Sequence, residues 1–152
     1  MNSYTELRNR QQEEFNAFPL GAAFSNAQFD EMMRKLGLEP TDTDKIYRLP
    51  GGVFLRKSDS PAFDEMVERQ SREREQAMAA DKTGLGYIKD MFAAELANNE
   101  FGYTYELDET LDALGLTLDK VKADKRLRKG LNKALKKYYK PEELIGRKII
   151  VV

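Results

Sequence analysis

The residues whose types and spacing most resemble those of an active site are two groups of carboxylates. One is Asp42 with Asp44, and the other comprises Glu106, Asp108, Glu109 and Asp112. Paired carboxylates can serve as general acid and base or can hold Mg²⁺. Neither group has the spacing of a calcium-binding loop, with its glycine and terminal glutamate. Because Asp42 and Asp44 are turn residues and Asp108 stands where a helix begins, local structure explains them, and we predict no metal site.

The sequence lacks the side chains on which most catalytic mechanisms depend. It contains no His and no Cys, which removes the commonest general base, the usual metal ligand and the thiolate nucleophile. The glycines of "GLG", Gly84 to Gly86, precede a predicted helix, but no strand and no Walker lysine accompany them. A loop and a helix start explain them. We predict no catalytic residues and no cofactor, and we expect a protein that is not an enzyme.

The most concentrated chemistry in the chain is basic. Residues 122–140 contain nine Lys or Arg and one Asp, whereas residues 1–121 contain 14 Lys or Arg and 23 Asp or Glu. Such asymmetry is typical of contact with nucleic acid or a membrane. At 100° per residue the basic segment forms an amphipathic helix with one apolar sector and a broad basic arc. The apolar sector comprises Leu127, Leu131, Ala134, Leu135 and Tyr138.

Two interpretations of the basic arc remain open. In the first, it binds nucleic acid without sequence preference, and an aromatic residue at its border stacks on an exposed base. The candidate nucleic-acid-binding residues are Lys125, Arg128, Lys129, Lys133, Lys136 and Tyr139. In the second, the arc is the solvated face of a helix whose charge the acidic remainder of the chain compensates. Neither interpretation gives a role to Gly130 in mid-helix.

The elements that must position these residues are mostly helices. Capping residues and apolar spacing predict five to six of them, with the main ones at about 4–17, 25–37, from 60, 85–98, 108–114 and from 124. In "KIYRLPGGVFLRK" the period changes to alternation around a Pro-Gly-Gly turn, which predicts a β-hairpin. The C-terminal "RKIIVV" has strong β character and is expected to add a third strand. The fold class is therefore α+β, predominantly helical.

A chain of 152 residues can bury a sizeable core, so we expect a single globular domain over residues 1–152. The apolar stripes of the helices are predicted to meet in one continuous core, comprising Leu7, Phe15, Phe29, Met33, Leu36, Ile88, Phe92, Leu96, Leu127, Leu131 and Leu135. The sequence shows neither a secretory signal nor a run of 18 apolar residues. We therefore expect a cytoplasmic protein without membrane contact.

Two other surfaces are candidates for binding a protein partner. The helix that opens at Ser60 continues into "ERQSREREQ", which is polar all round and is predicted to project into solvent. The segment "EFGYTYE" is either a short strand or a loop whose tyrosines form a contact surface of the kind enriched at interfaces. The candidate protein-binding residues are Arg69, Arg72, Glu73, Tyr103 and Tyr105.

Three segments of the chain resemble known sequences: "AFPLGAAFSNAQFDEMMRKLGL", "DKTGLGYIKDMFAAELANNEFGYT" and "TLDALGL". They are similar to a group of uncharacterised small proteins encoded on bacterial mobile elements and prophages, which carry a domain of unknown function. The resemblance implies an accessory role for a mobile element, such as inhibition of a host defence system. Our first hypothesis is thus an accessory protein that binds an unidentified host or element-encoded protein. The alternative is sequence-tolerant nucleic-acid binding through residues 122–140, and the sequence indicates no oligomeric state.

Overall fold

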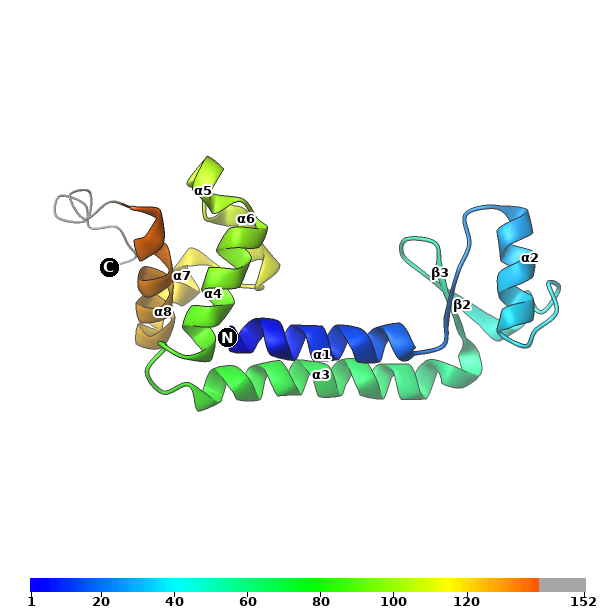
Figure 1. Ribbon diagram of the computed structural model, residues 1–152. Helices are drawn as coiled ribbons and strands as arrows, with labels where there is room; N and C mark the ends of the chain where they lie inside the picture. The colour runs from blue at the N-terminus through cyan, green and yellow to red at the C-terminus, as the bar shows by residue number, and fades with distance from the viewer. Residues whose placement is uncertain (140–152) are drawn as a thin grey trace. The chain divides into compact units, whose positions relative to one another are not determined.

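The computed structural model describes residues 1–139, which are mostly helical and include a small antiparallel sheet (Figure 1). The chain divides into two compact units. Unit 1 comprises Met1–Arg10 and the chain from Glu73 onward, and unit 2 comprises Gln11–Arg72. Two long helices, α1 (Ser3–Ala17) and α3 (Ser60–Ala80), contribute residues to both units.

Unit 2 contains the sheet, one helix against it and the adjoining halves of α1 and α3. The sheet comprises β1 (Leu20–Ala22), β2 (Ile46–Leu49) and β3 (Val53–Arg56) in the order β1-β3-β2, and both pairings are antiparallel. The helix α2 (Asn26–Lys35) begins at Ser25, whose side chain accepts a hydrogen bond from the backbone N–H of Gln28. These elements bury Met32, Met33 and Leu36, with Phe29 and Phe54 packed against them.

The sequence analysis predicted that the polar stretch of α3 projects into solvent. This prediction is wrong, because α1 packs along that stretch. In unit 2, Gln11 and Gln70 are buried, and each donates a side-chain N–H to the backbone carbonyl of the other. Two buried amides that satisfy one another in this way cost little and fix the helix register. Charge repeats alone do not reveal a partner helix that is equally polar.

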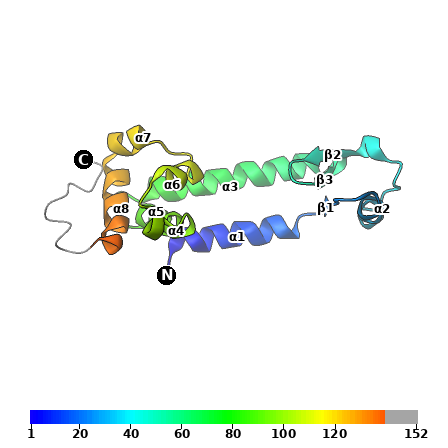
Figure 2. The same cartoon turned by 90° about the horizontal axis from the view of Figure 1, so that it is seen from above.

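Unit 1 is built on α4, which lies against α8 (Figure 2). Its helices are α4 (Tyr87–Asn98), α5 (Phe101–Thr104), α6 (Asp108–Ala113), α7 (Leu118–Ala123) and α8 (Lys125–Leu135). Ile88, Phe92, Leu96 and Leu131 are completely buried in its core. The basic helix α8 is held in place because its apolar face is part of this core.

Glycine explains how closely α8 approaches the start of α4. A Cβ on Gly130 would lie 2.6 Å from Cγ2 of Ile88 and 2.7 Å from the carbonyl oxygen of Gly84. Gly84 in turn has φ +83, and a Cβ there would lie 2.1 Å from the carbonyl oxygen of Arg126. Gly130, which had no role in the sequence analysis, therefore lets α8 contact the loop before α4.

The structure corrects several expectations about the elements. The part of the chain that is described forms eight α-helices rather than five to six, because α5 and α7 are additional short helices, whereas α6 lies where a helix was predicted. The hairpin is confirmed, and β1 adds a third strand to it. The predicted C-terminal strand lies outside the described residues. Asn2 caps α1, since its side chain accepts from the backbone N–H of Thr5 at 2.8 Å.

The prediction of one continuous core is wrong for the described residues. Buried apolar side chains form two separate clusters, one in each unit, and Phe15 is 36% exposed against Phe63. The stripe of each helix was assigned correctly in most cases, but periodicity does not say which stripes face one another. Whether the two units behave as a single domain stays a prediction.

Candidate functional site

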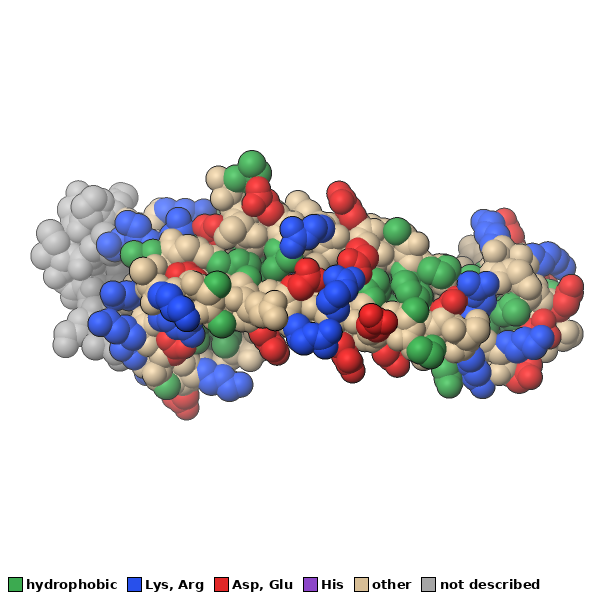
Figure 3. Space-filling view, turned by 90° about the horizontal axis from the view of Figure 1, so that it is seen from below, with side chains coloured by type: hydrophobic (Ala, Val, Ile, Leu, Met, Phe, Trp, Pro, Cys, Tyr) green, Lys and Arg blue, Asp and Glu red, His purple; other side chains and the backbone are tan. Residues whose placement is uncertain are grey.

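The basic surface at α8 contains a row of four lysines, here called the lysine row: Lys125, Lys129 and Lys133 on the helix, and Lys136 directly after its last residue. All four are exposed. At 100° per residue they fall within about 80° of one another, opposite the face that buries Leu127 and Leu131. Figure 3 shows Lys and Arg side chains gathered over this region of unit 1. The predicted amphipathic helix is thus confirmed, with its N-cap at Asp124.

The charges of the lysine row have no ionic partner within residues 1–139. In that part of the chain, the ion pair of α8 joins Arg126 to Asp124 at 3.2 Å. Lys125, Lys129 and Lys133 are spaced four residues apart, and like charges at this spacing destabilise a helix. Among the described residues, acidic compensation of the basic arc is therefore seen at Arg126 and not at the lysine row.

The two arginines of α8 serve the fold instead. Arg126 donates to the backbone carbonyls of Met78 and Asp81 at 2.9 and 3.2 Å, so it caps the C-terminus of α3. Arg128, a predicted nucleic-acid contact, donates to the backbone carbonyl of Lys122. These guanidinium groups already have partners, and the Lys137 ammonium lies 5.0 Å from the centroid of the Tyr138 ring. Among residues 1–139, the lysine row is therefore the group of exposed charges on this face that is available to a ligand.

The backbone amides of the "GLG" loop are also occupied. The Asp81 carboxylate accepts from the backbone N–H groups of Gly84, Gly86 and Ile88 at 2.9 to 3.0 Å. Desolvation by burial opposes ionisation, but these N–H donors hold the pKa of Asp81 below its usual value. A phosphate would have to displace this carboxylate. The loop is thus a structural junction, as the sequence analysis proposed.

An aromatic cluster lies where the lysine row ends. Phe101 is buried, and its ring is 5.1 Å from Tyr138 and 5.4 Å from Tyr105, measured between centroids. The rings of Tyr105 and Tyr139 are 5.8 Å apart and meet edge to face. The structure therefore brings Tyr105, predicted for protein binding, beside Tyr139, predicted for nucleic-acid binding.

The segment that carries Tyr105 is a short helix rather than the predicted strand or loop. Glu100 and Tyr105 bound α5, and both adopt the left-handed region with φ of 56 and 55. Residues other than Gly, Asn and Asp rarely adopt this conformation. The reversal of the chain at each end leaves Tyr103 88% exposed and Tyr105 53% exposed.

The remaining predicted protein-binding residues lie on α3, and two of them form ion pairs with α1. Arg69 forms an ion pair with Glu14 in unit 2, and both line a hollow of about 340 Å³. Glu73 forms an ion pair with Arg10 at 3.8 Å in unit 1. Arg72 is exposed. Arg69 and Glu73 thus stabilise the pairing of α1 with α3, each within its own unit.

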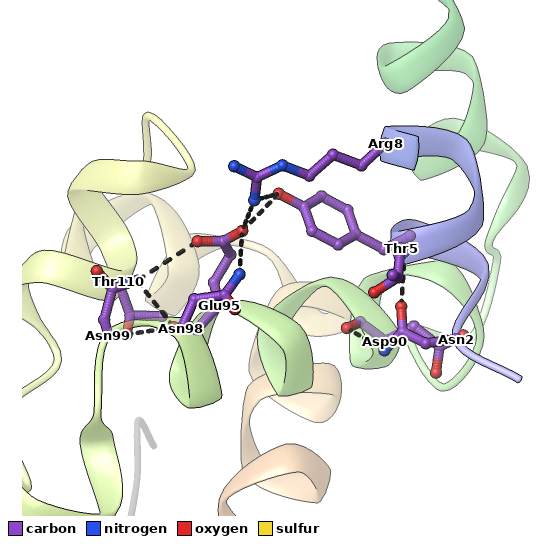
Figure 4. A network of polar contacts seen from close by, with 9 residues as sticks. Asn2, Thr5, Arg8, Asp90, Glu95, Asn98, Asn99 and Thr110 are labelled. Atoms are coloured by element: carbon purple, nitrogen blue, oxygen red, sulfur yellow. Dashed lines mark hydrogen bonds and ion pairs between the residues drawn. The ribbon is translucent and has the colours of Figure 1, made fainter. Parts of the chain in front are cut away.

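A buried polar network, which the sequence analysis missed, ties α1 to α4 within unit 1 (Figure 4). Glu95 is 3% exposed and accepts from the Tyr4 hydroxyl at 2.8 Å and from Arg8. Burial, together with this hydrogen bond to Glu95, raises the pKa of Tyr4 to about 12. The detectable signal was a carboxylate at position 95 on the apolar face of α4.

Asp42 and Asp108, one from each acidic group, have local structural roles. Asp42 accepts from the backbone N–H of Glu39 at 2.9 Å in a turn, and Asp108 lies in the first turn of α6. Among the described residues, no three acidic side chains are placed to hold a metal ion. Within the same residues, every helix is too short or too polar to cross a lipid bilayer.

Residues 3–137 match the model of a family of unknown function, DUF7659. No curated protein and no solved structure matches the chain significantly. The geometry of the described residues is thus the evidence from which a function can be inferred.

Proposed function

Since the chain belongs to the family of unknown function DUF7659, we propose from its geometry that it is an accessory protein that binds nucleic acid through the lysine row of α8, without sequence preference. The proposal takes the protein to be cytoplasmic and not an enzyme. The observation that carries it is the lysine row itself: four exposed lysines on one face, with no ionic partner among residues 1–139.

Like charges placed side by side on a helix cost folding free energy, and that cost is recovered when a polyanion binds. The rise from Lys125 to Lys133 is roughly 12 Å, and phosphates of one duplex strand follow one another every 3.4 Å or so along the axis. The row can therefore contact three to four consecutive phosphates. Lysine ammonium groups carry no geometric preference for a base, which supports binding that tolerates any sequence.

The test is fluorescence anisotropy with labelled DNA and RNA, single-stranded and duplex, at 50 mM salt. The variant replaces Lys125, Lys129 and Lys133 by Ala. Its control replaces three lysines of unit 2 by Ala and so changes the net charge equally. Those three each have a partner in the structure: Lys35 with Glu31, Lys45 with Asp42, and Lys57 over the ring of Tyr47.

We expect the α8 variant to bind at least tenfold more weakly than wild type, and the control to bind nearly as wild type does. Equal losses in the two variants would mean that net charge rather than the lysine row determines binding. No binding by wild type at tens of micromolar protein would leave the row a solvated helix face.

The second candidate is the protein-binding accessory role, and one observation favours it. Tyr103 is 88% exposed on α5, whose bounding residues adopt an unusual conformation, and exposed tyrosines are enriched at interfaces. An accessory protein of a mobile element that inhibits a host defence system can use such a surface. Capture of the same host protein by wild type after nuclease treatment, but not by Tyr103→Ala, would support this role.

A further inference from the structure

The aromatic cluster extends the lysine row with a different chemistry. Tyr139 lies three residues after Lys136, the last lysine of the row, and its ring meets that of Tyr105 at 5.8 Å. Tyr105 is about half exposed, so a ring surface accompanies the charges. Position 105 is 34 residues before position 139, and packing on Phe101 brings both together.

The backbone at Tyr105 is strained, with φ of 55. A tyrosine in the left-handed region is strained by roughly 1 kcal/mol or more relative to glycine. Its ring contacts with Phe101 and Tyr139 account for a tyrosine at this position. They hold the Tyr105 ring against Tyr139, a short distance along the chain after the lysine row.

We propose that the ligand of this surface is single-stranded nucleic acid, with its phosphates along the lysine row and an unpaired base against Tyr105 and Tyr139. This inference rests on the proposed function. Lysines attract duplex and single strands alike, whereas an exposed aromatic ring gains only from a base whose face is free. In a duplex those faces are already stacked. The combination of charge and ring is what favours the single strand.

The alternative is that both tyrosines only shield Phe101 from water. The two roles differ in what they require of the ring. Stacking needs an aromatic face, whereas shielding needs only apolar volume. Tyr139→Leu keeps the volume without the ring. Tyr105→Asn removes the ring in a residue that tolerates the left-handed backbone, and Phe at either position keeps the ring without the hydroxyl.

The experiment compares oligo(dT) and oligo(U) with duplex DNA and duplex RNA of the same length, by anisotropy at 50 mM salt. For the double variant Tyr105→Asn with Tyr139→Leu, we expect at least tenfold weaker binding of either single strand and unchanged binding of the duplexes. The Phe variants should bind as wild type. Tyr47→Leu, at a tyrosine of β2 that is 48% exposed, is the matched control and should change nothing.

A second measurement does not depend on how the double variant folds. The chain has seven Tyr and no Trp, so its intrinsic fluorescence comes from tyrosine. Titration of wild type with single strands should quench this fluorescence, duplexes should not, and Tyr105→Phe should reduce the quenching.

Three outcomes decide the matter. Tighter binding of single strands than of their duplexes, lost with the rings, supports the inference. Equal binding of single strands and duplexes, with Lys125, Lys129 and Lys133 still required, overturns it and leaves the proposed function standing. Absence of binding to every oligonucleotide overturns both.

Discussion

Replacement of Lys129 by Glu should stabilise the protein while it weakens nucleic-acid binding. Lys129 has Lys125 on one side and Lys133 on the other, each four residues away on α8. A like-charge pair at this spacing costs about 0.2 to 0.5 kcal/mol, and an opposite-charge pair gains about as much. Two pairs change sign, and Lys and Glu have similar helix propensities, so the gain in unfolding free energy is about 1 kcal/mol at low salt.

Urea denaturation followed by circular dichroism measures this gain. At 1 M salt, where charges are screened beyond about 3 Å, most of it should disappear. Lys35→Glu is the matched control with the opposite expectation. Lys35 forms an ion pair with Glu31 at 3.4 Å in the last turn of α2, so reversing its charge should destabilise the protein. An unchanged or lower stability of Lys129→Glu at low salt would refute the claim that repulsion within the lysine row destabilises α8.

Three further predictions concern contacts within unit 1. Gly130→Ala should lower the melting temperature despite the better helix propensity of Ala, because the new Cβ would lie 2.6 Å from Ile88. Gly102→Ala is the control and should not lower it, because its Cβ would lie at an ordinary contact distance of 3.5 Å from Tyr138. Asp81→Asn should destabilise the protein at pH 7, measured as a lower urea midpoint than wild type. Because the folded-state pKa of Asp81 is depressed, wild type loses this stability as the pH falls below about 4, so the difference between the two midpoints should narrow there. Glu95→Gln should lower the pKa of Tyr4 from about 12, measured by ultraviolet titration; an unchanged titration would show that burial alone raises it.

The local elements were predictable because their signals are local. Ser25, Gly37 and Asp124 mark helix ends by their own hydrogen bonds or backbone angles, and the Pro-Gly-Gly turn fixes the hairpin. The stripe of α8 was equally clear, since one face of it is apolar over three turns. These features require no knowledge of what lies across the interface.

The features that failed depend on contacts between distant segments. The three-residue strand β1 is too short for a periodic signal, and its pairing with β3 defines it. Glu95 occupies an apolar face because Tyr4 and Arg8 come from another helix to meet it. The meeting of Tyr105 with Tyr139 likewise arises from packing on Phe101, so the sequence analysis placed them on different surfaces.

The salt dependence of single-strand binding tests the central claim most directly. If the four charges of the lysine row each neutralise one phosphate, the logarithm of affinity should fall with the logarithm of salt with a slope of about −2.8. That slope corresponds to roughly a 50-fold loss between 50 and 200 mM salt. Replacement of Lys125, Lys129 and Lys133 by Ala should reduce the slope to about −0.7. A slope that is the same in wild type and variant would show that the lysine row does not contact the phosphates, and would contradict the account.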